Sequence, residues 1–287
     1  MKIAVASGKG GTGKTFVTVN LARSIGTPVA VLDCDVEAPN SSLFLRGKLV
    51  SEQAATLLIP RVNEKLCDGC RVCADVCEFN AIAVIAGTPL IFEDLCHGCG
   101  ACARFCPQGA ITEVPHKIGM ITVSASQNIT LVEGRLDVGK ALSVPVIRQV
   151  KAHEAATKYE TILLDAPPGT SCPVVWTLSG CDAVVLVAEP TPFGLHDLEI
   201  AVETAQEIGI PLGVVINKDG LGDDRVLTYC NEKKIPILGK IKHDRRIAET
   251  YARGGMIVEE IPEYQAVFSR MWDQVQELAT AGGKGNV

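Results

Sequence analysis

Short apolar runs, rich in β-branched residues, alternate with amphipathic stretches along much of the chain. The first run, Lys2–Ala6 (KIAVA), predicts a strand that is followed by a helix over Lys14–Ile25. Later runs predict further strands at Val29–Asp33, Thr161–Asp165, Ala183–Ala188, Leu212–Asn217 and Ile237–Ile241, with helices over Leu195–Ile208 and Asp244–Gly254. Continuous apolar strands separated by helices are typical of a mostly parallel sheet covered by helices on both faces. We therefore predict an α/β fold.

The alternation breaks between about Pro60 and Pro115, where short loops replace the periodic pattern and eight cysteines occur. The two halves of this segment look like an internal repeat, because Leu66-Cys67-Asp68-Gly69-Cys70 matches Leu95-Cys96-His97-Gly98-Cys99. We interpret residues 61–115 as a small inserted α+β domain. Residues 1–60 and 116–287 would then form one discontinuous domain.

Composition narrows the class of protein. The chain has 287 residues, 47% of them hydrophobic and 21% charged, which indicates a globular protein. A net charge of −6 argues against nucleic-acid binding. The chain lacks both an apolar run of membrane-spanning length and a signal-peptide pattern, so we expect a cytoplasmic protein. Its twelve cysteines then indicate metal or redox chemistry rather than disulfides.

A glycine-rich motif follows the first predicted strand and opens the first predicted helix. Residues 8–15, GKGGTGKT, fit the pattern G-x-x-x-x-G-K-[ST] in full. The backbone N–H groups of this loop and the helix N-terminus are expected to hold phosphates; the loop residues are Gly8, Lys9, Gly10, Gly11, Thr12, Gly13, Lys14 and Thr15. Lys14 is expected to reach the β- and γ-phosphates, and the Thr15 hydroxyl to bind Mg²⁺.

Lys9 makes this loop more specific. The string K-G-G-T-G-K-T resembles the deviant Walker A motif of the MinD/ParA/Mrp ATPases, whose relatives include nitrogenase iron protein. The resemblance implies that Lys9 crosses a face-to-face dimer and touches the partner's nucleotide, where a cation would stabilise developing charge. It also implies ATP hydrolysis, with Lys9, Lys14 and Asp35 as the catalytic residues.

Further motifs match this family in order. Asp33-Cys34-Asp35 resembles switch I, where Asp35 would orient or deprotonate the attacking water and Asp33 would help to hold Mg²⁺. The stretch from Asp165 to Thr170, DAPPGT, resembles the Walker B/switch II motif, with Asp165 binding Mg²⁺ through water. Asn217 resembles the base-recognition residue and would face adenine. Phe16 departs from the family, which usually has Thr there, so we expect altered nucleotide affinity.

The eight clustered cysteines form two copies of the bacterial ferredoxin run, C-x2-C-x2-C-x3-C. In that pattern the fourth cysteine of each run ligates the other cluster. We therefore assign Cys67, Cys70, Cys73 and Cys106 to one [4Fe-4S] cluster, and Cys96, Cys99, Cys102 and Cys77 to a second. Zinc is the competing interpretation, but zinc sites do not need the third and fourth cysteine of each run.

The other four cysteines are interpreted mainly as packing residues. Cys34, Cys181 and Cys230 are expected to be small core side chains. Cys172, just after switch II, is expected to be a structural thiol, with cluster ligation as the alternative. A final helix near Glu263–Ala279 has an apolar stripe, and we expect it to pack on the core rather than to anchor the chain to a membrane.

The chain as a whole resembles MinD-superfamily ATPases with an inserted ferredoxin domain. This implies a MgATP-dependent dimerisation switch, as a homodimer or a heterodimer with a paralogue, coupled to two clusters for electron transfer or redox sensing. The alternative is a positioning or partner-recruiting protein with sensory or structural clusters, acting in cell division or with a metal-cluster protein of the orange-protein type. An Fe–S cluster carrier is a third, less favoured possibility, because a paired C-x-x-C near the C-terminus is absent.

Overall fold

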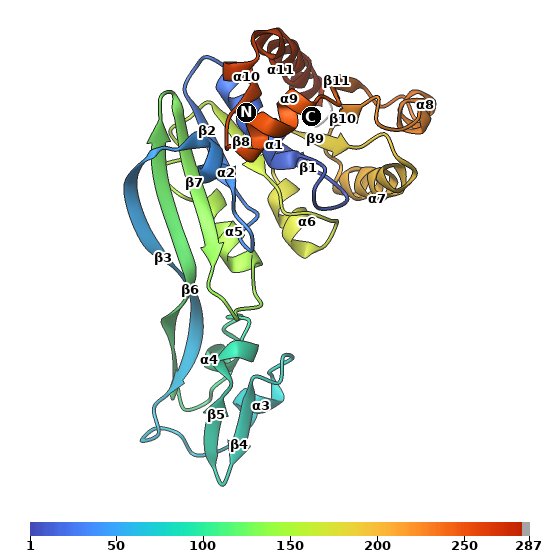
Figure 1. Ribbon diagram of the computed structural model, residues 1–287. Helices are drawn as coiled ribbons and strands as arrows, with labels where there is room; N and C mark the ends of the chain where they lie inside the picture. The colour runs from blue at the N-terminus through green and yellow to red at the C-terminus, as the bar shows by residue number, and fades with distance from the viewer. Residues whose placement is uncertain (283–287) are drawn as a thin grey trace.

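A mostly parallel sheet forms the centre of the molecule, as the sequence predicts (Figure 1). The computed structural model describes residues 1–282, and within them nine strands form this sheet. The parallel strands come in the order β11 (Ile237–Lys242), β10 (Leu212–Asp219), β9 (Ala183–Ala188), β1 (Lys2–Ala6), β8 (Thr161–Asp165), β2 (Val29–Asp33) and β7 (Ile129–Leu136). Antiparallel pairing then adds β6 (Ile111–Ser126) and β3 (Lys48–Val62) at one edge.

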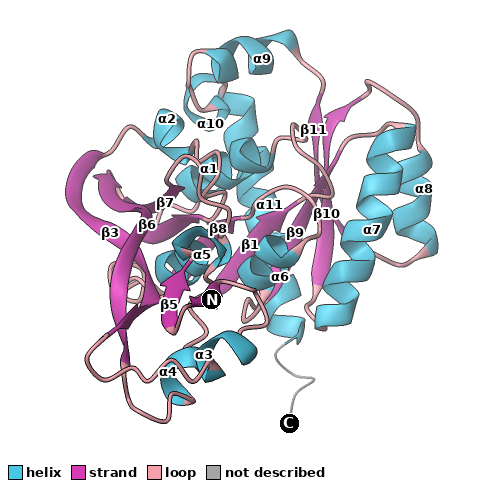
Figure 2. Cartoon of the chain, turned by 90° about the horizontal axis from the view of Figure 1, so that it is seen from below, coloured by secondary structure: helices cyan, strands magenta, loops and turns pink. Residues whose placement is uncertain are grey.

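Helices cover both faces of the sheet (Figure 2). One face carries α1 (Lys14–Ser24), α10 (Ile257–Glu260) and α11 (Pro262–Gly282). The other carries α5 (Val144–Lys151), α6 (Cys172–Leu178), α7 (Pro192–Ile208) and α8 (Arg225–Glu232). Strand β1 shows why both faces are apolar, because Ile3 and Val5 pack into the first layer and Ala4 and Ala6 into the second.

Helix α11 is the last described element. Its side chains Phe268, Met271 and Val275 are buried in the hydrophobic core against α1 and the sheet. The prediction that the apolar stripe of this helix packs on the core is therefore confirmed. Within residues 1–282, no helix has both the length and the apolar character needed to cross a membrane.

The long antiparallel ribbon of β3 and β6 was not predicted from the sequence. The two strands pair from Lys48 opposite Ala125 to Val62 opposite Ile111, so they run through the expected break points at Pro60 and Pro115. The segment that connects them, residues 63–110, is called the cysteine module below. It contains α3 (Val72–Asp75), β4 (Ile82–Ile85), β5 (Thr88–Ile91), the 3₁₀ turn η1 (Glu93–Leu95) and α4 (Ala101–Arg104).

The cysteine module projects from the end of the ribbon, below the large sheet in Figure 1. Part of the module packs into the main hydrophobic core: Ala81 and Cys96 lie in the same buried cluster as Leu57 and Ile118. A separate small core joins Cys73, Ile82 and Cys102 of the module to Ile111 of β6. The module is thus joined to the main body by a continuous ribbon and by shared packing.

Candidate functional site

A cavity of about 400 Å³ opens at the carboxyl ends of the parallel strands. Ligands of open α/β sheets bind at this edge, because the loops that follow neighbouring strands meet there. The loops after β1, β2, β8, β10 and β11 all contribute. The lining residues are Gly10, Gly11, Gly13, Lys14, Thr15, Phe16, Asp35, Asn40, Pro168, Asn217, Lys218, Lys242, His243, Asp244, Ile247, Ala248 and Tyr251.

Two glycines of the loop after β1 are required by close approaches. A Cβ at Gly8 would lie 2.0 Å from the carbonyl oxygen of Asp197 in α7. Gly13 has φ +96°, a left-handed conformation that favours glycine, and a Cβ there would lie 2.4 Å from Nδ2 of Asn217. The loop backbone therefore packs closely against both α7 and β10, just before the start of α1.

Asn217 holds this loop from the end of β10. Its Nδ2 donates a hydrogen bond to the backbone carbonyl of Thr12 at 2.8 Å, and its Oδ1 accepts one from the N–H of Lys218 at 3.0 Å. Both ends of the side-chain amide are thus used within the protein, although Asn217 also lines the cavity. The structure therefore places Asn217 as a support of the loop, whereas its predicted contact with adenine stays a prediction.

Thr15 lines the cavity, and its partner Asp165 is fully buried. The Thr15 hydroxyl donates to Oδ2 of Asp165 at 2.5 Å, and the Thr18 hydroxyl lies 3.2 Å from Oδ1. Burial, together with the nearby charge of Asp33, raises the pKa of Asp165 to about 8. Burial lowers the pKa of Lys14, while Asp165 and Asp35 oppose that change. The buried carboxyl groups of Asp165 and Asp33 lie near each other, and the Thr15 hydroxyl contacts Asp165. Oxygen donors of this kind suit a hard divalent cation.

Asp33 and Asp35 belong to the segment after β2. The carboxylate of Asp33 accepts hydrogen bonds from the backbone N–H groups of Asp35, Asn40 and Ser41 at 3.0–3.1 Å. It thereby shapes the segment that leads into α2 (Ser41–Leu45), and burial raises the pKa of Asp33 to about 6. Asp35 lines the cavity, and burial also raises its pKa, against the charge of Lys14.

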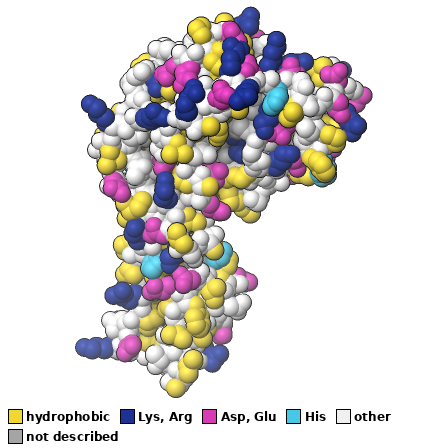
Figure 3. Space-filling view, viewed as in Figure 1, with side chains coloured by type: hydrophobic (Ala, Val, Ile, Leu, Met, Phe, Trp, Pro, Cys, Tyr) yellow, Lys and Arg dark blue, Asp and Glu magenta, His cyan; other side chains and the backbone are white. Residues whose placement is uncertain are grey.

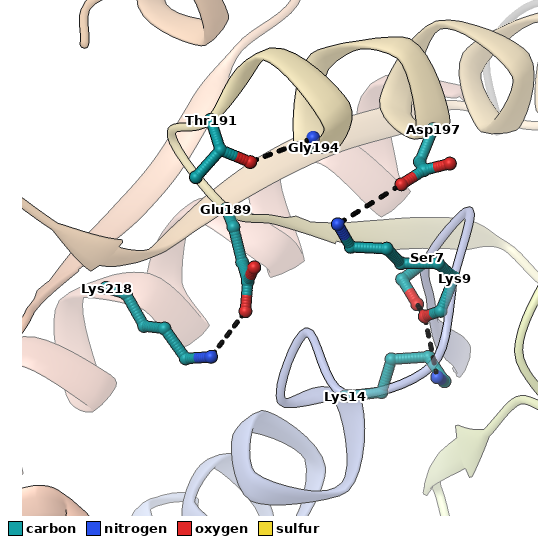
Figure 4. A network of polar contacts seen from close by, with 8 residues as sticks. All are labelled: Ser7, Lys9, Lys14, Glu189, Thr191, Gly194, Asp197 and Lys218. Atoms are coloured by element: carbon teal, nitrogen blue, oxygen red, sulfur yellow. Dashed lines mark hydrogen bonds and ion pairs between the residues drawn. The ribbon is translucent and has the colours of Figure 1, made fainter. Parts of the chain in front are cut away.

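Lys9 turns away from the cavity. Its Nζ lies 3.4 Å from Oδ2 of Asp197 on α7, whereas Lys14 turns back toward the carbonyl of Lys9 (Figure 4). The side chains of Lys9 and Asp197 keep 33% and 26% of their exposure, so the ion pair is accessible and weak. Lys9 is therefore held at the surface beside the loop, where a cation can be redirected at small cost.

Sequence reasoning missed one wall of the cavity. It is formed by Lys242 at the end of β11, by His243 and Asp244, which follow it, and by Tyr251 of α9 (Arg245–Ala252). Their position after a parallel strand of the same sheet is the signal that could have identified them. Phe16 forms edge-to-face contacts with Tyr251 at 6.0 Å and with Phe268 at 6.4 Å between ring centroids, so the residue that departs from the family is part of this aromatic wall.

The cysteine module repeats its own backbone conformation. Left-handed residues recur at matching positions in the two halves, with φ +74° at Gly69 and +64° at Gly98, and +70° at Arg71 and +73° at Gly100. Backbone N–H groups also recur as donors to sulfur: Ala81 to Cys77 and Ala110 to Cys106, both at 3.3 Å. The internal repeat read from the sequence is therefore present in the local geometry.

The eight cysteines line two separate cavities of the module. One is lined by Cys67, Cys70, Cys73 and Cys106, and the other by Cys77, Cys96, Cys99 and Cys102. These are the two quartets that the spacing predicts. Burial, with a smaller contribution from Cys96 and Cys99, raises the pKa of Cys102 to about 11. In residues 1–282, no three His, Cys, Asp or Glu side chains are arranged to hold a single metal ion.

The remaining cysteines lie in the main body. Cys34 and Cys230 are fully buried, which confirms their prediction as core side chains, and Cys181 is partly buried against the same core. Cys172 is exposed at the first position of α6. Cys172 lines neither of the two cavities formed by the eight clustered cysteines.

Known proteins resemble the chain over most of its length. An uncharacterized protein of Methanocaldococcus jannaschii is 31% identical over 263 residues, with 88% of this chain and 90% of that protein covered. An iron-sulfur cluster carrier protein of the same organism is 26% identical, with 83% and 65% covered. The septum site-determining protein MinD complexed with Mg-ADP from Pyrococcus horikoshii has the same fold, with a TM-score of 0.60, 21% identity and coverage of 100% and 99%.

A match to a known family extends from β1 to the start of α10. Residues 3–257 match the family described as the CobQ/CobB/MinD/ParA nucleotide binding domain. The match includes every element that forms the cavity, from the glycine loop to α9. The chain belongs to the CobQ/CobB/MinD/ParA family of nucleotide-binding proteins.

Proposed function

We propose that the chain hydrolyses MgATP as a dimerisation switch and couples this switch to two [4Fe-4S] clusters, for electron transfer or redox sensing. One observation carries the proposal: a phosphate-loop cavity and two cavities lined by four cysteines each are joined in one chain by the paired strands β3 and β6. Nucleotide and clusters would thus act on connected parts of one chain.

In the nucleotide cavity, each proposed role follows from position. Lys14 would bind the β- and γ-phosphates, Thr15 and Asp165 would hold Mg²⁺, and Asp35 would orient the attacking water. Asp33 would support Mg²⁺ binding mainly by fixing the segment that carries Asp35. Lys9 would leave Asp197 and reach the nucleotide of a second subunit, supplying positive charge during phosphoryl transfer.

In the cysteine module, the thiols fit a cluster better than a single metal ion. Four cysteines line each cavity, and each run has the third and fourth cysteine of the spacing C-x2-C-x2-C-x3-C, which a zinc site does not need. When bound, each [4Fe-4S] cluster would supply one-electron chemistry. The chain would hold it by four thiolates and direct backbone N–H groups to sulfur, as at Cys77, Cys96 and Cys106.

Two other functions have specific support. The module exposes large apolar side chains, including Leu66, Leu90 and Phe105, which favour a partner-recruiting role without electron transfer. On the face drawn in Figure 3, hydrophobic side chains gather on the module, whereas acidic and basic side chains are mixed over the main body. The iron-sulfur cluster carrier relative supports a carrier role, in which a labile cluster would pass to another protein.

The test is anaerobic purification with iron and sulfide analysis, then electron paramagnetic resonance of the reduced protein with and without MgATP. About eight irons per chain and a spectrum that changes with MgATP would support the coupled switch. Eight irons with an indifferent spectrum and no reducible acceptor would favour the recruiting role. Transfer of iron and sulfide to an apo-ferredoxin would favour the carrier role, and zinc in place of iron would contradict all three.

A further inference from the structure

Helix α5 lies between the helix that follows switch II and the base of the cysteine module (Figure 1). Its side chains and the loop before it contact three different parts of the chain: α6, strand β3 and the turn η1. No motif identified from the sequence falls on α5, and the proposed nucleotide and cluster roles do not use it.

Lys151, at the end of α5, binds the C-terminal end of α6. Its Nζ donates to the backbone carbonyls of Trp176 at 2.7 Å, Thr177 at 2.8 Å and Ser179 at 2.7 Å. Carbonyls in the last turn of a helix have no partner within the helix, so a cation there satisfies them and complements the helix dipole. The guanidinium carbon of Arg148 also lies 5.0 Å from the centroid of the Trp176 ring. These contacts tie α5 to α6.

Gln149 ties the same helix to β3. Its Nε2 donates to the carbonyl of Thr56 at 2.9 Å, and its Oε1 accepts from the N–H of Thr56 at 3.1 Å. The pairing of β3 with β6 shifts register between Ala55 and Thr56. Gln149 therefore holds β3 at the irregularity that lies between the large sheet and the cysteine module.

Lys140, in the loop before α5, reaches the module itself. Its Nζ lies 2.6 Å from Oδ1 of Asp94 and 3.3 Å from Nε2 of His116. Nδ1 of His116 lies 3.5 Å from Oε2 of Glu93. Glu93 and Asp94 belong to η1, which directly precedes Cys96. The loop before α5 is thus fastened to the turn that leads into one of the two cysteine quartets.

We propose that α5 transmits movement between switch II and the cysteine module. Helix α6 begins directly after the Gly169–Ser171 segment, and the N–H of Gly169 bonds to the carbonyl of Ser7 beside the phosphate loop. A rearrangement of this segment with nucleotide displaces α6, and Lys151 carries the displacement to α5. Gln149 then acts on β3, and Lys140 acts on η1. The inference rests on the proposed nucleotide binding at this cavity.

The coupling is thermodynamically reciprocal, so the occupancy or oxidation state of the cysteine module changes nucleotide affinity by the same factor. A contiguous set of polar contacts supplies a physical route for it, in which each contact can be removed by one substitution. Lys151→Met removes the three hydrogen bonds that join α5 to α6. Lys140→Met removes the contact with η1 without touching α6 or β3. Lys158→Met, at an exposed lysine, is the matched control.

The experiment is hydrogen–deuterium exchange of the full, anaerobically purified chain with and without MgADP, with MgADP affinity measured separately by calorimetry. In the unmodified chain, peptides that cover residues 93–99 are expected to change their exchange rate by about fivefold on MgADP binding. The Lys151→Met variant keeps its MgADP affinity within about threefold but loses this response. The Lys158→Met control keeps both.

Each contrary outcome is distinct. A module that does not respond in the unmodified chain, while MgADP protects the phosphate loop, overturns the coupling and leaves nucleotide binding intact. A full module response in Lys151→Met overturns the route through α5. Absence of MgADP binding overturns both this inference and the proposed function. Should Lys151→Met fail to fold by circular dichroism, Lys140→Met gives the same decision, because it must weaken the response of η1.

Discussion

Nδ2 of Asn217 donates to the carbonyl of Thr12 at 2.8 Å and so joins the end of β10 to a loop 205 residues earlier in the chain. Asn217→Ala leaves this carbonyl unpaired in a buried setting, which costs about 1–3 kcal/mol in the free energy of unfolding. We expect urea unfolding to show this loss and calorimetry to show weaker MgADP binding. The exposed Asn231→Ala is the control and should change neither value.

Thr15 and Thr18 both contact the carboxylate of Asp165, but only Thr15 lines the cavity. Thr15→Val and Thr18→Val should each lower stability by about 1 kcal/mol through loss of a hydroxyl contact. Only Thr15→Val is expected to lose the difference between ADP affinity with and without Mg²⁺, because it removes a proposed ligand. Equal Mg²⁺ dependence in the two variants would contradict the role proposed for Thr15.

Asp165 predicts a dependence of stability on pH in the Mg²⁺-free protein. Burial raises its pKa to about 8, while an unfolded aspartate titrates near pH 4. Between these values the unfolded chain has lost a proton that the folded chain keeps, so stability falls as pH rises, by at most about 1.4 kcal/mol per pH unit. Thermal unfolding in chelator should show this slope, and Asp165→Asn should reduce it. Stabilisation by MgADP should instead grow with pH, because the Mg²⁺ site proposed here uses the ionised carboxylate of Asp165.

The two cysteine quartets predict separable iron losses. Cys70→Ser removes a thiol from one cavity and Cys99→Ser removes one from the other. Each variant is expected to lose up to about four of eight irons, and the double variant more. Cys172→Ser, at an exposed thiol outside both cavities, should keep the full iron content. A loss of iron in Cys172→Ser would instead support the alternative that this cysteine is a cluster ligand.

Lys9 should matter for hydrolysis more than for binding. Because its ammonium group pairs with Asp197 outside the cavity, Lys9→Ala is expected to leave MgADP affinity within about threefold. Phosphate release should fall at least about tenfold if the side chain acts on a second subunit. Light scattering with a slowly hydrolysed ATP analogue measures dimer formation in parallel. Unchanged phosphate release would contradict the proposed role in trans.

The sequence predicted the parallel strands other than β7, mainly because they are apolar runs. The edge of the sheet was harder to predict. The first half of β3, from Lys48 to Ala54, is exposed and mixes polar with apolar residues, so it lacks the pattern of a buried strand. Strand β7 contains Gly134, which weakens a strand prediction, but a Cβ there would lie 2.6 Å from Val150 of α5. Contacts with distant elements fixed these strands, and local pattern could not.

The candidate sites, like the strands, were predictable where local sequence pattern determines them and not where distant contacts do. The cysteine quartets could be predicted from spacing. Each cavity is lined by the first three cysteines of one run, which are close in sequence, and by the fourth cysteine of the other run. The role of Asn217 as a support of the loop depends on a contact between the two ends of the fold, and the aromatic wall of Phe16 and Tyr251 depends on the placement of α9. The position of α9 after a parallel strand signals that it lies near the cavity, but which of its side chains meet Phe16 depends on tertiary packing.

The length of the β3/β6 ribbon determines where the cysteine module lies relative to the large sheet. Because β3 and β6 stay paired from the large sheet to the cysteine module, the module is connected by a two-stranded ribbon rather than by two separate single-chain linkers. Removing two residues from each strand would draw the module in by about 7 Å with the same side facing the body, whereas removing one would turn it over. The number of residues in the ribbon therefore sets both the distance of the cysteines from the large sheet and the direction in which they face.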